Sequence, residues 1–79
     1  HRQVEAEAQA SELQRRIGEK IREGRKSLGL TLAQLAERTG LSVGFLSQIE
    51  LGKNSASVDT LYRIAMALSV QPGDFFKDA

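Results

Sequence analysis

The chain has 79 residues, a length that supplies one small hydrophobic core and not two. It contains no cysteine and a single histidine, His1, which excludes disulfides, thiolate metal sites and the usual Ser/His/Asp or Cys/His catalytic arrangements. An ordinary enzyme is therefore close to excluded, and we expect neither a metal ion nor a cofactor. The 11 Lys and Arg residues and 10 Asp and Glu residues give a net charge of +1 and a pI of about 8.4, below the pI of about 9 that marks nucleic-acid-binding domains by charge alone.

The ends of the chain predict where the protein resides. No apolar run approaches the roughly 18 residues that favour a membrane-spanning helix, and the N-terminus lacks the basic-then-apolar order of a secretory signal. We expect a cytoplasmic protein with no membrane partner. Because the chain lacks an initiator Met and stops just after Phe75 and Phe76, we also expect that it is part of a longer protein.

The first residues differ in composition from the rest. Residues 1–12 are rich in Ala, Glu and Gln, which are strong helix formers, and Val4 is their only large apolar residue. They predict a helical arm that extends the first helix backwards, either as a surface extension or as a dimerising or linking helix. We place this arm at residues 1–13, the folded domain at residues 14–77, and a tail, or the start of a linker to an absent domain, at residues 78–79.

Helix start and stop signals divide the remainder. Thr31 with Gln34 is typical of a capping box, Ser42 and Ser57 are further N-cap candidates, and Pro72 fits the first turn of a last helix. The stop signals are Gly29, Gly40 and Gly52, each after a run of helix formers.

Apolar residues between these signals recur at helical spacing and do not alternate as strands do. The expected fold class is therefore all-α, with five short helices. Their inward faces are predicted to carry Leu13, Ile17, Ile21 and Leu28 in the first helix, Leu32, Leu35 and Ala36 in the second, Leu46 and Ile49 in the third, Leu61, Ile64, Ala65 and Leu68 in the fourth, and Phe75 or Phe76 in the fifth.

Residues 31–52 read TLAQLAERTGLSVGFLSQIELG and predict a helix-turn-helix. Ala36 is small enough for the two helices to pack closely, and Gly40 can adopt the positive φ of the sharp corner. Leu46 and Ile49 point back into the core. In such a motif the second helix stands out from the body far enough to enter a DNA major groove.

The opposite face of the third helix carries the candidate base-reading residues. Gln48 can form two hydrogen bonds to adenine, Ser47 can donate or accept, Val43 can pack on a thymine methyl, and Gly44 lets the backbone approach closely. Each has a plainer alternative: Gln48 and Ser47 as solvated residues, and Val43 packed against the turn. Phe45 stays open between a core residue, a groove wedge and a partner surface.

The motifs LGLT, LAQLAERTG, LSVGFLSQIELGK, SVDTLYRIAMAL and PGDFF follow one another in this sequence. In order and spacing they resemble the Cro/repressor-like, or XRE-type, helix-turn-helix DNA-binding family over roughly residues 14–77. The resemblance implies a lambda-repressor-like fold and base-reading positions at Val43, Gly44, Ser47 and Gln48. GLSVGFLSQIE, SVDTLYRIA and PGDFF are similar to members with a C-terminal cupin sensor domain, which implies a small-molecule effector bound by a domain absent from this chain.

Phosphate contacts are expected at helix N-termini and nearby polar groups. The family grips phosphate near the start of the second helix and in the loop after the third. Leu51 departs from the polar or basic residue that the family often has at its position, which puts one phosphate contact in doubt. The candidates in this sequence are Thr31, Gln34, Ser42, Lys53, Asn54 and Ser55.

Charge is distributed unevenly along the chain. The resemblance implies an ion pair between Arg25 and Glu50 that ties the first helix to the third, whereas the sequence alone leaves both as solvated charges. Residues 41–49 carry no charge, so arginine readout of guanine by the third helix is excluded. The first helix is basic and either flanks the DNA backbone or is simply solvated; its basic residues are Arg15, Arg16, Lys20, Arg22, Arg25 and Lys26.

We therefore expect sequence-specific binding of double-stranded DNA by a transcriptional regulator, with the third helix in the major groove and a homodimer on an inverted repeat. The alternative is a protein–protein interaction module that uses the exposed surface of Val43, Phe45 and Leu51. The dimerisation surface is open between the arm, the fifth helix and an absent C-terminal domain.

Overall fold

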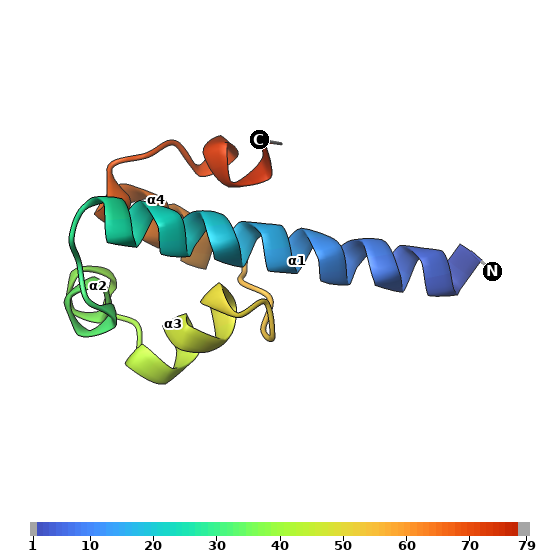
Figure 1. Cartoon of the computed structure of the whole chain (residues 1–79), viewed down its shortest axis with the longest axis horizontal. Coiled ribbons are helices and arrows are strands. Elements are labelled where there is room, and N and C mark those ends of the chain that lie inside the picture. The colour runs from blue at the N-terminus through green and yellow to red at the C-terminus, as the bar shows by residue number, and fades with distance from the viewer. Residues whose placement is uncertain (1, 78–79) are drawn as a thin grey trace.

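The computed structural model describes residues 2–77, and all of the regular secondary structure over that range is helical. Figure 1 shows the helices α1, α2, α3 and α4, followed by a short 3₁₀ helix, η1. This confirms the predicted all-α fold class. His1 and the tail predicted at residues 78–79 lie outside the described residues. The bounds are Arg2–Ser27 for α1, Leu32–Thr39 for α2, Val43–Glu50 for α3, Val58–Leu68 for α4 and Pro72–Phe76 for η1.

α1 includes the predicted helical arm, which extends the first helix backwards to Arg2. It has 26 residues, which corresponds to about 39 Å of helix and accounts for most of the 42 Å longest extent of the molecule. Its first half projects beyond the other helices (Figure 1). The helix continues through residue 13 without a break, so arm and first helix are one element, and a domain boundary at that point remains a prediction.

The helix boundaries follow the local capping signals. Thr31 Oγ1 accepts a hydrogen bond from the Gln34 N–H at 3.0 Å, and the Thr31 N–H donates to Gln34 Oε1 at 2.8 Å, which confirms the predicted capping box. Ser42 and Ser57 cap α3 and α4, each hydroxyl accepting a hydrogen bond from the N–H three residues later. Gly40 ends α2 with a φ of 75°, which a residue with a side chain adopts only at a cost. These local bonds set the sharp corner between α2 and α3.

The fifth predicted helix is a single 3₁₀ turn and not an α-helix. Its N–H groups bond three residues back: Asp74 to the Gln71 carbonyl at 2.9 Å and Lys77 to the Asp74 carbonyl at 3.4 Å. With five residues and Pro72 at its start, the segment is too short to establish a series of α-helical bonds. Lys77 and the Gln71 N–H both bond to the Asp74 carboxylate and hold the pKa of that carboxyl below its usual value.

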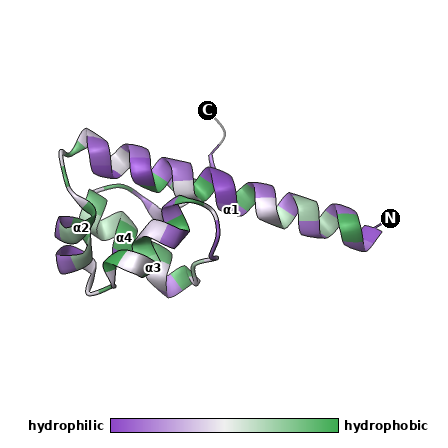
Figure 2. Ribbon diagram, turned by 60° about the horizontal axis from the view of Figure 1, so that its bottom comes forward, coloured by the Kyte–Doolittle hydropathy of each residue, from purple (hydrophilic) through white to green (hydrophobic). Residues whose placement is uncertain are grey.

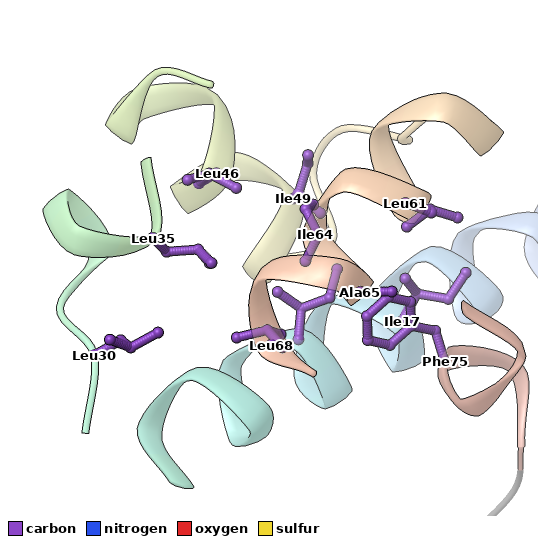
Figure 3. Close-up of a cluster of buried hydrophobic side chains, with 11 residues drawn as sticks. Ile17, Leu30, Leu35, Leu46, Ile49, Leu61, Ile64, Ala65, Leu68 and Phe75 are labelled. Atoms are coloured by element: carbon purple, nitrogen blue, oxygen red, sulfur yellow. The ribbon is translucent and has the colours of Figure 1, made fainter. Parts of the chain in front are cut away.

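The core forms where α1, α2, α3 and α4 meet, and η1 covers one end (Figure 3). Leu28, predicted inward, is 48% exposed because α1 ends at Ser27 and Leu30 enters the core instead. Leu13, also predicted inward, is 38% exposed because it lies at the border of the projecting arm. Phe75 is buried and Phe76 exposed. The buried hydrophobic residues are Ile17, Ile21, Leu30, Leu35, Leu46, Ile49, Leu61, Ile64, Ala65, Leu68 and Phe75.

Two glycines allow α1 to pack very closely against the C-terminal end of α3. A Cβ added at Gly18 would lie 2.3 Å from the carbonyl oxygen of Ile49 and 2.6 Å from that of Glu50. From the other side, a Cβ added at Gly52 would lie 2.8 Å from the Cα of Arg15. The backbones of α1 and α3 are therefore in direct contact, and the end of α3 is fixed by main chain as well as by side chains.

We expect Gly18→Ala to destabilise the fold by about 2–3 kcal/mol, because backbone atoms must move to make room for the new methyl group. Gly44→Ala is the matched control, since a Cβ at Gly44 meets nothing within 4 Å and alanine has the higher helix propensity. Urea unfolding followed by circular dichroism measures both. Equal stability of Gly18→Ala and the wild type would contradict the close approach.

Candidate nucleic-acid interface

α3 presents one face to the core and the opposite face outward. Leu46 and Ile49 are 0% and 2% exposed and anchor the helix. Val43 and Gly44 are exposed, and Ser47 and Gln48 are half-buried on its flank. The four candidate base-reading residues thus lie on α3 outside the core, within a stretch that has no charged side chain from residue 41 to residue 49. Their contact with bases remains a prediction.

The hydropathy colouring separates α3 from the long helix beside it. Figure 2 shows α3 mainly white and green, whereas the part of α1 that overlies the body is largely purple. Leu51, the departure noted in the sequence, is 53% exposed at the C-cap of α3. Phe45, left open above, is half-buried and packs against the core.

Arg25 and Glu50 form the ion pair that the family resemblance implies. Arg25 Nε donates to Glu50 Oε2 at 2.7 Å and Nη2 donates to Oε1 at 3.0 Å, a two-point arrangement. The third donor, Nη1, bonds the carbonyl oxygen of Leu30 at 2.8 Å. The two side chains are only 11% and 5% exposed. The hydrogen bond that Arg25 donates to Glu50 raises the pKa of Arg25, against the opposing effect of burial. The positively charged Arg25 therefore joins α1, the turn before α2 and the end of α3.

The candidate phosphate-contacting residues fall into two groups. Thr31, Gln34 and Ser42 lie at the starts of α2 and α3, where their side-chain oxygens already cap backbone N–H groups. The Gln34 amide nitrogen is a further donor on an exposed side chain. Lys53, Asn54 and Ser55 are exposed in the connection between α3 and α4. Ser42 thus lies at the start of α3, Lys53, Asn54 and Ser55 follow its end, and Thr31 and Gln34 lie at the start of α2. The contact of all six with phosphate also remains a prediction.

Thr39 positions the turn of the motif, a role that the sequence analysis missed. It is 7% exposed, its hydroxyl donates to the Leu35 carbonyl at 2.8 Å, and it accepts from the Leu41 N–H at 3.3 Å. A threonine directly before the glycine that ends α2 is the signal that could have identified it. It fixes the path of the chain from α2 into α3.

Two kinds of site are not found among residues 2–77. No helix there is both long and apolar enough to cross a membrane. The same residues contain no group of three or more His, Cys, Asp or Glu side chains that could hold a metal ion.

Comparison with known proteins points to one family. The chain matches the Helix-turn-helix family over residues 21–75. It is 45% identical over 53 residues to an uncharacterized HTH-type transcriptional regulator of Mycobacterium tuberculosis, covering 67% of this chain and 38% of that protein. The chain therefore spans well under half the length of this relative.

Solved structures agree with the match. A transcriptional regulator of the HTH_3 family from Vibrio cholerae superposes with a TM-score of 0.80 at 36% identity, over 85% of this chain and 38% of that one. The restriction-modification controller protein C.AhdI from Aeromonas hydrophila superposes with a TM-score of 0.77 at 28% identity, over 80% of this chain and 96% of that one.

Removing one member of the buried ion pair should destabilise the protein strongly. We expect Glu50→Leu to cost about 3–5 kcal/mol, because it leaves the Arg25 guanidinium buried without its counter-charge. The double variant Arg25→Met with Glu50→Leu should recover part of that loss, since no unpaired charge remains, although the Leu30 carbonyl loses its donor. Denaturant unfolding of the two single variants and the double variant measures the coupling. Strictly additive effects would argue against the pair.

Proposed function

The chain belongs to the Helix-turn-helix family, and from this premise we propose that it binds double-stranded DNA sequence-specifically within a transcriptional regulator, with α3 in the major groove. Its family and fold are those of DNA-binding domains of transcriptional regulators, which are not enzymes. The observation that carries the proposal is an uncharged, outward face on α3, whose own C-terminal end is held against α1 by backbone contact and a buried ion pair.

The proposed base contacts use amide, hydroxyl and methyl groups. Gln48 pairs with the N6 and N7 edge of adenine, Ser47 bonds a neighbouring base, and Val43 packs on a thymine methyl. Gly44 brings the helix backbone close to the floor of the groove. Since α3 supplies no arginine, we expect a preference for A·T pairs at the positions that α3 contacts.

The proposed phosphate contacts lie around α3. Thr31 and Gln34 bind phosphate at the start of α2 and Ser42 binds phosphate at the start of α3, with backbone N–H groups of the helix starts directed to the phosphates. Lys53, Asn54 and Ser55 bind phosphate after the end of α3. These contacts set the register in which α3 reads the bases.

We propose a homodimer on an inverted repeat, because one short reading helix contacts only a few base pairs. An apolar groove of about 300 Å³ lies between α1, the start of α4 and η1. Exposed Leu13, Val58 and Phe76 line it, and Asn54 and Ser55 border it. A second copy seated in this groove would stand beside the same phosphate strand, so a second copy of this chain is the occupant that we assign to it.

The proposed unit of DNA binding is residues 14–77. A small-molecule effector, if one regulates the protein, would act through a part beyond this chain, such as a cupin sensor domain. The alternative role as a protein-binding module is the weaker one, because Phe45, the largest of its three side chains, packs partly against the core.

Gln48→Ala should relax base preference at one position per half-site, at a cost of about 1–3 kcal/mol on the preferred duplex and little on others. Lys53→Ala should instead weaken binding to all duplexes and reduce the slope of log K against log salt by about 1 for each bound protomer. In-vitro selection followed by titration at several salt concentrations measures both. A wild-type protein that binds selected duplexes no better than random DNA would exclude sequence-specific binding.

Val58→Glu should convert the dimer to a monomer, because it places a charge in the apolar groove, while an acid in the first turn of α4 is tolerated by the helix. Met66→Glu is the matched control: Met66 is 77% exposed on the same helix and lies outside the groove lining. Sedimentation equilibrium reports the mass. If Met66→Glu dissociates the dimer and Val58→Glu does not, the interface lies outside the groove. A wild-type protein that binds DNA as a monomer would contradict the homodimer.

A further inference from the structure

A shallow hollow of about 210 Å³ lies where α1, the first turn of α2 and the C-terminal half of α3 meet. It brings Ser47, a candidate base-reading residue, next to side chains of α1. The hollow thus lies at the edge of the surface assigned to DNA. Its lining consists of Arg22, Arg25, Leu32, Ser47, Glu50 and Leu51.

The charges in this hollow do not balance. Arg25 and Glu50 neutralise each other in the buried pair, and Leu32 and Leu51 contribute apolar walls. Arg22 is exposed, and its guanidinium has no hydrogen-bond or ion-pair partner among residues 2–77. The hollow therefore carries one net positive charge, on the Arg22 guanidinium. This group can donate two parallel hydrogen bonds.

Two neighbouring cations of α1 face other groups. Arg15 lies two helical turns before Arg22 on the same face, but it pairs with Glu12 and with Glu19. Lys20 is about 200° around the helix from Arg22 and lines a different hollow, against Asp74 and Phe75 of η1. Figure 1 shows α3 and η1 on opposite sides of α1. Among residues 2–77, the α1 cations that line the hollow beside α3 are Arg22 and the paired Arg25.

We propose that Arg22 binds a phosphate of the DNA backbone, seated in the hollow between Leu32 and Leu51. A guanidinium matches phosphate oxygens in a two-point geometry, and the two leucines shield the contact from water, which strengthens it. This assignment rests on the proposed function. It explains the exposed Leu51 as a wall of the phosphate site, and it supplies from α1 the positive charge that α3 lacks.

Two variants test the assignment, Arg22→Gln and Lys20→Gln. Each removes one positive charge, and the two residues lie on opposite faces of α1. Wild type and both variants are titrated with a selected duplex and a random duplex between about 50 and 200 mM salt. For Arg22→Gln we expect the slope of log K against log salt to fall by about 1 for each bound protomer on both duplexes, with base preference retained. For each bound protomer, the affinity gap to wild type should therefore shrink about threefold over this salt range. Lys20→Gln should keep the wild-type slope.

Arg22→Lys should restore the slope, because it restores the charge. Thermal unfolding of the Arg22 variants should match the wild type, since the side chain is exposed. An unchanged slope in Arg22→Gln, or an equal loss in Lys20→Gln, would overturn the assignment while leaving the proposed function intact. A wild-type protein without preference for the selected duplex would instead contradict the proposed function.

Neutral methylphosphonate linkages, introduced one at a time into the selected duplex, locate the contact. We expect one position in each half-site at which a neutral linkage weakens binding by the wild type. The same linkage should not weaken binding by Arg22→Gln any further, because this variant already lacks the positive charge that pairs with the phosphate. Inorganic phosphate tests the free anion as the ligand. Displacement of DNA by millimolar phosphate at constant ionic strength, in the wild type but not in Arg22→Gln, would assign the hollow to the free anion and overturn the backbone contact. An equal loss at every methylphosphonate position in both proteins would also overturn it.

Discussion

The position of α3 depends on a contact between two backbones. At Gly18 of α1 there is no room for a side chain against the carbonyl oxygens of Ile49 and Glu50, and at Gly52 there is none against the backbone of Arg15. The Arg25–Glu50 pair then closes the same junction with charge. A contact between main chains has few alternative arrangements, because no rotamer change can relieve it. α3 is consequently held at one height and one angle on the body.

This rigid support fits the chemistry of the base contacts proposed for α3. Amide, hydroxyl and methyl contacts are short-ranged, so they discriminate between bases only if the helix arrives in a defined position. Attraction over longer distances must come from outside α3. The basic side chains of α1, with Lys53 beyond the end of α3, can provide it. Charge and base readout are thereby assigned to different elements of one small domain.

Local signals in the sequence predicted most of the helix boundaries, because a capping box such as Thr31 with Gln34 needs only neighbouring residues. What failed depended on distant parts of the chain. Leu28 and Leu30 are equally apolar, and only the end of α1 at Ser27 decides which one is buried. Gly18 carries no signal of its own, since its role comes from the approach of α3.

The candidate site was likewise predictable only where its residues follow from local sequence patterns or from the family resemblance. The positions on α3 follow from helical periodicity, and the Arg25–Glu50 pair follows from family resemblance. The hollow that contains Arg22 could not be predicted, because it joins three elements that are separate in the sequence. Thr39 was missed for a related reason: its bonds to Leu35 and Leu41 exist only once the turn has formed.

The exposure of Val43 and Gly44 has a consequence for evolution and for protein engineering. The Val43 side chain is exposed and outside the core, and a Cβ added at Gly44 would meet nothing within 4 Å. Substitutions at these two positions should therefore change stability little. Duplicated copies of such a domain can diverge in operator preference while the scaffold stays constant, and a library randomised at these positions should consist largely of folded proteins.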